Sequence, residues 1–291
     1  MAKLAFLGLG VMGYPMAGHL QKKGGHQVTV YNRTGAKAQQ WAGEFGGKHA
    51  ASPREAAKDC DFVMLCVGND DDVRSVVYGD SGALAGMRRG AILVDHTTAS
   101  ALLAKELFAK AKERGVGFID APVSGGQAGA QNGQLGIMCG GAPADFNLAK
   151  PVLDVYAKMC ALIGGPGSGQ LTKMVNQIAI AGLVQGLAEG LAFAKRANLD
   201  VEKVVGVISK GAAQSWQMEN RWKQMNELKF DGFGFAVDWM RKDLGMCLEE
   251  AKRNGSRLPA TALIDQFYAW VQARGGRRWD TSSLMHLLMK D

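Results

Sequence analysis

Three glycines follow a short apolar run near the start of the chain. The segment Gly8-Leu9-Gly10-Val11-Met12-Gly13 fits the pattern G-x-G-x-x-G. In such a loop the first glycine permits a tight turn, the second lets backbone approach a pyrophosphate, and the third lets a helix pack closely on a strand. The helix that follows offers free N–H groups and a partial positive charge to phosphates. These residues are candidates to bind a dinucleotide, and a glycine-rich turn without a ligand is the alternative.

The flanking residues predict the elements that such a loop requires. The apolar run at residues 3–7 predicts a strand, and residues 12–23 predict a helix with Met16 and Leu20 on one face. Residues 28–31, all of types that favour strands, predict a second strand. Strand, helix and strand within about thirty residues form a βαβ unit, which is the context in which this glycine pattern indicates a dinucleotide site.

The residues after the second predicted strand bear on which dinucleotide fits. A carboxylate at this place usually binds the ribose of NAD(H), but this chain has Asn32, Arg33 and Thr34 there. Asn32 removes a carboxylate that would repel a 2′-phosphate, and Arg33 can pair with that phosphate. The Thr34 hydroxyl can donate a hydrogen bond to the same phosphate or cap the next helix. We therefore expect a preference for NADP(H), with NAD(H) as the alternative cofactor.

Apolar runs continue to alternate with helical patterns up to residue 163. Further strands are predicted at residues 62–67, 92–95, 117–120, 136–139 and 160–163, with a helix at about 98–114. Continuous apolar strands alternating with helices indicate a parallel sheet covered on both faces. We therefore expect an α/β fold in which residues 1–163 form a Rossmann domain with a doubly wound sheet.

The pattern changes at the glycine-rich segment 164–167. Residues 168–196 form one long helical pattern without proline, roughly 40 Å long at 1.5 Å per residue. Shorter helical segments follow, with breaks near 198–200, 231–234 and Pro259. We expect residues 164–291 to form an all-helical domain for substrate binding and oligomerisation, joined to the first domain by the long helix.

Four segments in the correct order resemble one enzyme family. They are the glycine loop with its extension to Ala17, residues 120–126 (Asp-Ala-Pro-Val-Ser-Gly-Gly), residues 167–177 and residues 242–244 (Lys-Asp-Leu). They are similar to the signatures of the β-hydroxyacid dehydrogenases, which include 3-hydroxyisobutyrate dehydrogenase and the tartronate semialdehyde, glyoxylate and succinic semialdehyde reductases. The resemblance spans most of the chain. It implies a Rossmann domain, a helical second domain and a homodimer or homotetramer.

The resemblance makes Lys173 the candidate general acid/base. Hydride transfer between an alcohol and a carbonyl requires a group that takes up or supplies the hydroxyl proton. A lysine can do so when burial or a nearby cation lowers its pKa. Without the resemblance, an exposed helix lysine would be the simpler interpretation. Asn176, which shares a helix face with Lys173, matches an asparagine that positions substrate, whereas Gln177 is expected to be structural.

The other candidate binding residues follow predicted strands. Ser124, Gly125 and Gly126 come after a strand end, where parallel sheets bind ligands. Their backbone N–H groups can form an anion-binding nest for a substrate carboxylate, and a plain turn is the alternative. The resemblance further implies cofactor contacts by one group of residues: Val67, Gly68, Asn69, Thr98 and Lys242. The residues after Thr98 lack the proline common in the family, and no role is assigned to His96. Asp238 is either a charge that selects among substrates or an ordinary surface acid.

Composition excludes several classes of protein. The chain has 291 residues, 47% hydrophobic and 21% charged, as in a soluble globular protein. No apolar run approaches the ~20 residues of a membrane span and no signal peptide is recognised, so we expect a cytoplasmic protein without a membrane partner. Five cysteines without a C-x-x-C pair and scattered histidines predict no metal site. The net charge of +7 suits anionic ligands, while the short basic stretch 274–278 does not predict nucleic-acid binding.

The sequence therefore predicts an oxidoreductase that transfers a hydride between NADP(H) and a small carboxylate-bearing hydroxy acid or semialdehyde. The expected substrates are of the 3-hydroxyisobutyrate, glyoxylate or succinic semialdehyde type. An imine reductase and a non-catalytic NADP-binding protein are the alternatives. Relatives of both kinds commonly lack the lysine, so Lys173 favours the dehydrogenase.

Overall fold

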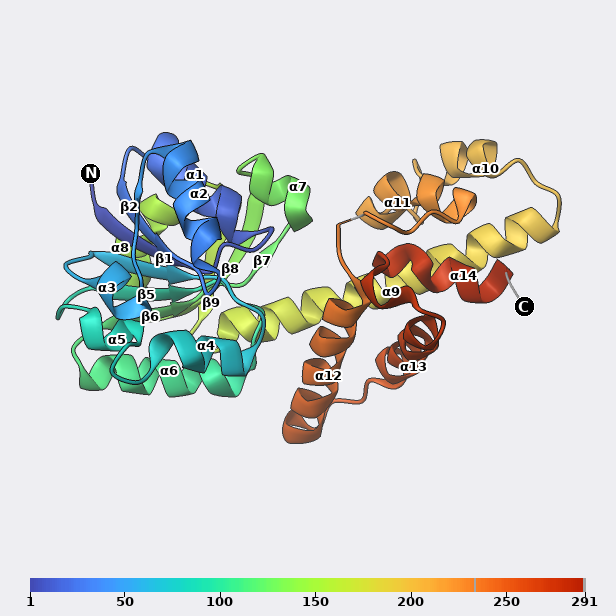
Figure 1. Cartoon of the computed structure of the whole chain (residues 1–291). Helices are drawn as coiled ribbons and strands as arrows, with labels where there is room; N and C mark the ends of the chain where they lie inside the picture. Colours follow the sequence, from blue (N-terminus) through green and yellow to red (C-terminus); the bar gives the residue numbers. More distant parts are fainter. Residues whose placement is uncertain (233, 290–291) are drawn as a thin grey trace. The chain divides into compact units, whose positions relative to one another are not determined.

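The computed structural model describes residues 1–232 and 234–289. Phe233, which belongs to the predicted helix break at 231–234, and residues 290–291 of the predicted second domain lie outside the described residues. The chain forms two compact units, Met1–Lys173 and Met174–Asp291 (Figure 1). The domain boundary predicted after residue 163 stays a prediction.

The first unit is built on a nine-stranded sheet. The strands run in the order β3-β2-β1-β4-β5-β6-β8-β7, and β9 pairs with β8. Their bounds are β1 (Lys3–Leu7), β2 (Gln27–Tyr31), β3 (Lys48–His49), β4 (Phe62–Leu65), β5 (Ile92–Asp95), β6 (Gly117–Asp120), β7 (Val123–Ser124), β8 (Leu135–Gly141) and β9 (Ala157–Gly164). The doubly wound order confirms the predicted fold class.

The carboxyl ends of the first six strands in this order reach one edge of the sheet. Leu7 at the end of β1 pairs in parallel with Tyr31 of β2 and with Leu65 of β4. The same register continues from Leu65 to Asp95 of β5 and from Asp95 to Asp120 of β6. The strand order reverses between β1 and β4, and the crevice at such a switch point is where open α/β sheets bind ligands.

One part of the sheet differs from the parallel arrangement expected from the sequence. Strand β8 runs antiparallel to both β6 and β7. Only residues 121–122 separate β6 from β7, so these two strands run in one direction, and β8 returns between them after the short helix α7 (Gly126–Gln131). The connection between β7 and β8, residues 125–134, is too short for the crossover that two parallel neighbours require.

Alternating residues of β1 face two different cores. Leu4 and Phe6 pack with Met16 and Trp41 in one cluster, and Leu7 packs in the other. Helices cover both faces (Figure 1). Their bounds are α1 (Gly13–Lys22), α2 (Gly35–Phe45) and α8 (Pro143–Leu153) on the first face, and α3 (Pro53–Ala57), α4 (Asp70–Val77), α5 (Ala83–Gly86) and α6 (Ala101–Glu113) on the second.

The long helix α9 (Ser168–Arg196) has the bounds that the sequence predicts. By length and composition alone it could cross a membrane, but half of its most apolar stretch is buried inside the protein. Ala181, Val184 and Leu191 pack in the core of the second unit. Burial in this helical core therefore accounts for part of the hydropathy of α9.

The described residues of the second unit contain helices and no strand, as expected. After α9 come α10 (Val201–Ile208), α11 (Trp216–Glu227), α12 (Val237–Asn254), α13 (Pro259–Ala273) and α14 (Leu284–Met289). Pro259 occupies the first turn of α13, where its missing N–H costs no hydrogen bond. Val237, Met240 and Leu244 of α12 are buried in the shared core.

Candidate functional site

The three glycines of the first loop differ in what the fold requires of them. Gly8 has φ +94°, and a Cβ there would collide with the carbonyl oxygen of Cys66. A Cβ at Gly13 would collide with the carbonyl oxygen of Gly8. A Cβ at Gly10, by contrast, would have no described atom of the chain within 4 Å apart from its immediate neighbours. The open space beside the Gly10 backbone fits the close approach of a pyrophosphate.

Asn32 joins this loop to the end of β2. Its Oδ1 accepts a hydrogen bond from the Leu9 N–H at 2.9 Å, and its Nδ2 donates to the Thr34 carbonyl oxygen at 3.1 Å. Thr34 is the N-cap of α2, but within the described chain its hydroxyl makes no capping hydrogen bond. The Arg33 side chain is 88% exposed, and its Nη1 lies 3.4 Å from Oδ1 of Asp72. A cation therefore stands beside the predicted ribose position.

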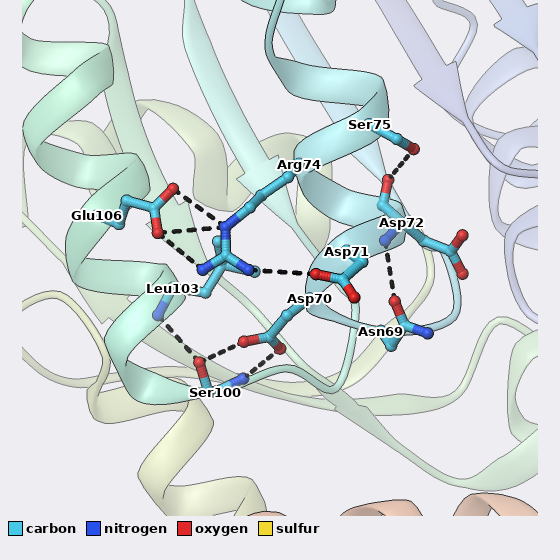
Figure 2. Close-up of polar contacts among 9 residues, drawn as sticks. All are labelled: Asn69, Asp70, Asp71, Asp72, Arg74, Ser75, Ser100, Leu103 and Glu106. Atoms are coloured by element: carbon cyan, nitrogen blue, oxygen red, sulfur yellow. Dashed lines mark hydrogen bonds and ion pairs between the residues drawn. The ribbon is translucent and has the colours of Figure 1, made fainter.

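The loop after β4 is fixed by the start of α4 and by the loop after β5. The Val67 N–H donates to Oγ1 of Thr97 at 3.1 Å. Asn69 is the N-cap of α4, and its Oδ1 accepts from the Asp72 N–H at 2.9 Å. Asp70 in turn accepts from the N–H and hydroxyl of Ser100 at 2.9 and 2.5 Å (Figure 2). The Asn69 side chain thus has a capping role that the sequence analysis did not assign.

Two buried side chains that the sequence analysis did not single out fasten the start of α9 to this edge of the sheet. The Asp120 carboxylate accepts hydrogen bonds from the N–H groups of Gly167 and Gln170 at 2.8 and 2.9 Å. The Gln170 side chain accepts from the Ala99 N–H at 3.0 Å and donates to the Thr97 carbonyl oxygen at 2.7 Å. Thr98, a predicted cofactor contact, is therefore flanked on both sides by bonds to Gln170.

Lys173 lies one helical turn after Gln170 and is the last residue of the first unit. Its side chain is buried, with 7% exposure. Because the preceding turn is anchored to Asp120 and to the loop at 97–99, Lys173 stands on a helix that is fixed relative to the carboxyl edge of the sheet. The interpretation of Lys173 as an ordinary exposed helix residue is thereby disfavoured.

Three buried titratable residues lie at the ends of two neighbouring strands. Asp95 ends β5, His96 follows it, and Asp120 ends β6. Burial raises the pKa of Asp95 to about 7 and that of Asp120 to about 6. Burial also lowers the pKa of His96 to about 4. Nδ1 of His96 contacts the Ala121 carbonyl oxygen at 2.7 Å and its Nε2 contacts the Tyr156 hydroxyl at 2.8 Å. A carbonyl only accepts, so Nδ1 carries the proton, and His96 serves as a neutral core residue.

The predicted carboxylate-binding segment lies beyond the end of β6. Ser124 ends β7 and pairs with Gly136 of β8, whereas Asp120 pairs with Gly140 farther along the same strand. Gly125 and Gly126 both have positive φ angles, +129° and +62°. Residues with side chains rarely adopt such a pair of conformations, so the glycines are required by the turn itself.

The remaining predicted residues belong to the second unit. Nδ2 of Asn176 donates to Oε1 of Gln177 at 2.8 Å, and Nε2 of Gln177 donates to the buried Asp243 carboxylate at 2.6 Å. Nζ of Lys242 lies 3.2 Å from Asp243 and 5.9 Å from the centre of the Trp239 ring. Asn176 and Lys242 are thus linked through Gln177 and Asp243 within that unit.

Asp238 already has partners on neighbouring segments. Its carboxylate accepts from Nε2 of Gln272 at 2.6 Å and from Nε of Arg277 at 3.4 Å. These contacts favour a structural role over selection among substrates. Within residues 1–232 and 234–289, no group of three or more His, Cys, Asp or Glu side chains is arranged to hold a metal ion.

In the first unit the carboxyl edge of the sheet gathers one set of predicted residues. It comprises the glycine loop, residues 32–34, residues 67–69, Thr98 and Lys173. Asp120 and Gln170 could have been noticed in the sequence, because both lie in segments that resemble family signatures. Asp72 could not, because its contact with Arg33 depends on the strand order.

Both parts of the chain are similar to known protein families. The family described as "NAD binding domain of 6-phosphogluconate dehydrogenase" matches residues 3–164, and that described as "NAD-binding of NADP-dependent 3-hydroxyisobutyrate dehydrogenase" matches residues 167–288. An uncharacterized oxidoreductase of Shewanella frigidimarina is 64% identical over 290 residues, covering 100% of this chain and 99% of that protein. The 2-hydroxy-3-oxopropionate reductase of Escherichia coli is 34% identical over 286 residues, covering 98% of this chain and 97% of that protein.

Solved structures show the same architecture. The 3-hydroxyisobutyrate dehydrogenase of Mycobacterium tuberculosis superimposes with a TM-score of 0.90 at 28% identity, covering 100% of both chains. An imine reductase of Myxococcus stipitatus shares the fold, with a TM-score of 0.65 at 19% identity and coverage of 98% and 99%. The dinucleotide-binding domain, the helical second domain and these relatives together show the family. The chain belongs to the β-hydroxyacid dehydrogenase family and is an NAD(P)-binding oxidoreductase.

Proposed function

We propose that this oxidoreductase interconverts a small hydroxy acid and the corresponding semialdehyde, with Lys173 as the general acid/base. The observation that carries the proposal is the burial of Lys173 on a helix start that Asp120 and Gln170 hold at the carboxyl edge of the sheet. Two relatives support the substrate class, because their names, 2-hydroxy-3-oxopropionate reductase and 2-(hydroxymethyl)glutarate dehydrogenase, describe enzymes that act on hydroxy acids or oxo acids.

The chemistry divides between the cofactor and the chain. A bound nicotinamide supplies or accepts the hydride. In the reducing direction Lys173 donates a proton to the substrate carbonyl oxygen as that oxygen gains charge. In the oxidising direction it takes the proton from the hydroxyl group. By the family resemblance, Ser124, Gly125 and Gly126 would bind the substrate carboxylate, and Thr98 would contact the nicotinamide end of the cofactor. In the second unit, Lys242 would have a cofactor-binding role and Asn176 would orient the substrate.

The preferred cofactor in this proposal is NADP(H). Arg33 is a cation beside the position of the ribose 2′-phosphate, and Asn32 replaces the carboxylate that would repel that phosphate. An Arg33→Ala variant should bind NADPH at least tenfold more weakly and bind NADH almost unchanged. Equal affinity of variant and parent for NADPH would refute the NADP(H) assignment.

Lys173 is tested by comparing Lys173→Met with Lys110→Met, an exposed lysine that pairs with Glu113. NADPH oxidation is measured with a panel of semialdehydes, glyoxylate and cyclic imines. We expect Lys173→Met to lower kcat about 10²–10⁴-fold, the usual size of acid/base catalysis, with the NADPH dissociation constant unchanged and Lys110→Met fully active.

An undiminished rate of Lys173→Met would refute the mechanism. Turnover of imines alone would support the imine reductase instead. Tight NADPH binding without turnover of any substrate would support a non-catalytic binding protein.

We also propose that the protein is a cytoplasmic homodimer or homotetramer. Helix α9 exposes Val175, Leu183 and Phe193, which are 67, 45 and 72% accessible. Large apolar side chains exposed on one helix suit a protein–protein contact. Light scattering of the purified chain should give twice or four times the monomer mass, and a monomer at micromolar concentration would contradict this proposal.

A further inference from the structure

Three consecutive acids open helix α4, and their partners lie in three different places: the loop after β5, α4 itself and the loop after β2. Asp70 binds Ser100, and Asp71 lies 3.5 Å from Nη1 of Arg74. Asp72 lies 3.4 Å from Nη1 of Arg33, which follows β2. Figure 2 shows Asp70 and Asp71 directed toward Ser100 and Arg74, whereas the Asp72 carboxylate points to the opposite side. Of the three acids, Asp72 is therefore the one that faces the proposed 2′-phosphate site.

The backbone of Asp72 is held in place on both sides. Its N–H donates to Oδ1 of Asn69 at 2.9 Å, and its carbonyl oxygen accepts from the Ser75 hydroxyl at 2.7 Å. The Asp72 side chain is 33% exposed, against 88% for Arg33. The contact between them is a single one at 3.4 Å. A carboxylate carried on a fixed stretch of backbone therefore stands beside an arginine that is largely in solvent.

The contact changes the charge that a ligand meets at Arg33. Arg33 alone would present one positive charge, but the pair of Arg33 and Asp72 is neutral overall. A 2′-phosphate bound by Arg33 must either replace Asp72 as its partner or lie close to that carboxylate. In both cases the phosphate loses attraction or meets a like charge. A dinucleotide without the 2′-phosphate is affected much less.

We propose that Asp72 is a specificity-determining residue that limits the preference of this enzyme for 2′-phosphorylated cofactors. The inference rests on the proposed function, in which Arg33 binds the 2′-phosphate. Asp72 acts through Arg33 and through its own charge, and it leaves the nicotinamide end of the site untouched. Its removal strengthens NADP(H) binding and leaves NAD(H) binding nearly constant.

The test compares Asp72→Asn with Asp71→Asn in the full chain. Both variants remove one acid from the first turn of α4, so general effects on the helix cancel. Calorimetry measures the binding of NADPH, NADH, adenosine 2′,5′-bisphosphate and AMP, the last two differing only in the 2′-phosphate. We expect Asp72→Asn to bind NADPH and the bisphosphate about three- to fivefold more tightly, the upper range for exposed charge pairs. NADH and AMP, and all four ligands with Asp71→Asn, should change less than about twofold.

Salt provides a second measurement of the same effect. At about 0.5 M NaCl the Debye length falls to roughly 4 Å, so the gain of Asp72→Asn should shrink to less than about twofold. Unchanged or weakened NADPH binding by Asp72→Asn at low salt would overturn the inference, as would an equal gain with Asp71→Asn. Arg33→Ala separates the two proposals. If it loses affinity for the bisphosphate while Asp72→Asn gains none, only the inference about Asp72 fails. If Arg33→Ala binds the bisphosphate normally, the NADP(H) assignment itself fails.

Discussion

The carboxylate of Asp120 accepts a hydrogen bond from the backbone N–H of Gln170 at 2.9 Å and so joins the end of β6 to the first turn of α9. The same carboxylate accepts from the Gly167 N–H at 2.8 Å. Asp120 is completely buried, so these two N–H groups have their acceptor in the interior of the protein. Together with the side-chain bonds of Gln170, Asp120 thereby anchors the start of the helix that carries Lys173.

Replacement of Asp120 should therefore weaken the fold and the catalytic site together. Asp120→Ala leaves two buried N–H groups without this acceptor, at a cost of about 1–3 kcal/mol each in the free energy of unfolding. Urea denaturation at about pH 8 measures the loss. Asp154→Ala, an exposed acid paired with Lys150, should cost at most about 1 kcal/mol. Equal stability of the two variants would contradict the anchoring role.

Gln170 should matter for cofactor binding as well as for stability. Gln170→Ala removes the bonds to the Ala99 N–H and the Thr97 carbonyl oxygen and so releases the loop that carries Thr98. We expect a loss of about 1–3 kcal/mol in the free energy of unfolding and a higher dissociation constant for NADPH. The control is Gln185→Ala on the same helix, where a half-buried glutamine donates to the exposed Glu189 one turn away. If both variants bind NADPH like the parent, Gln170 has no positioning role.

The glycine loop should separate the requirements of the fold from those of the ligand. Gly10→Ala adds a methyl group in open space, so its midpoint of denaturation should stay close to that of the parent. Its affinity for NADPH should fall at least tenfold, because the methyl group occupies the path of the pyrophosphate. Gly13→Ala should instead destabilise the fold, because its methyl group would collide with the Gly8 carbonyl oxygen. Normal NADPH binding by Gly10→Ala would argue against a pyrophosphate at this position.

The buried carboxyl groups should make stability depend on pH. Burial raises the pKa of Asp95 to about 7, above its value of about 4 in an unfolded chain. The folded state thus binds the proton more tightly, so this group stabilises the fold below about pH 4 and loses that contribution as pH rises through about 7. The free energy of unfolding of the parent, minus that of Asp95→Asn, should fall between about pH 4 and pH 7.

His96 changes the pH dependence of stability in the opposite direction. The effect of Asp95 is therefore measured as the difference between the parent and Asp95→Asn. Burial lowers the pKa of His96 to about 4. Its contribution is present above about pH 6.5 and is lost as pH falls through about 4. Because His96 is common to the parent and to Asp95→Asn, its effect cancels in the comparison. A difference that stays constant with pH would show that Asp95 has an ordinary pKa.

Much of the fold can be predicted because its strands are continuous apolar runs. The buried strands at residues 62–65 and 92–95 lie within predicted strands, and the helix at residues 168–196 has its predicted bounds, so all three are confirmed. The two-residue strand β3 is not predicted, since Lys48 and His49 are exposed and polar and pair only at the sheet edge. The antiparallel direction of β8 is not predicted either, because hydrophobic patterns do not encode the direction of a strand.

The candidate site is predictable where short motifs carry it and not where distant residues meet. The glycine loop and Lys173 lie in segments that can be recognised in the sequence. Asp95 and Asp120 leave a weaker signal, because each ends a buried strand with a carboxylate. The contact of Arg33 with Asp72 joins residues 39 positions apart. It exists because β2 and β4 both flank β1, and this order cannot be read from local patterns.

The open space at Gly10 also bears on how this loop can change over evolutionary time. Gly8 and Gly13 are constrained by contacts inside the protein, whereas Gly10 meets no such constraint from the described chain. A descendant that stopped using a dinucleotide could therefore accept mutations at Gly10 while still retaining Gly8 and Gly13. The identity of this single residue would then distinguish relatives that still carry a cofactor from relatives that have kept only the scaffold.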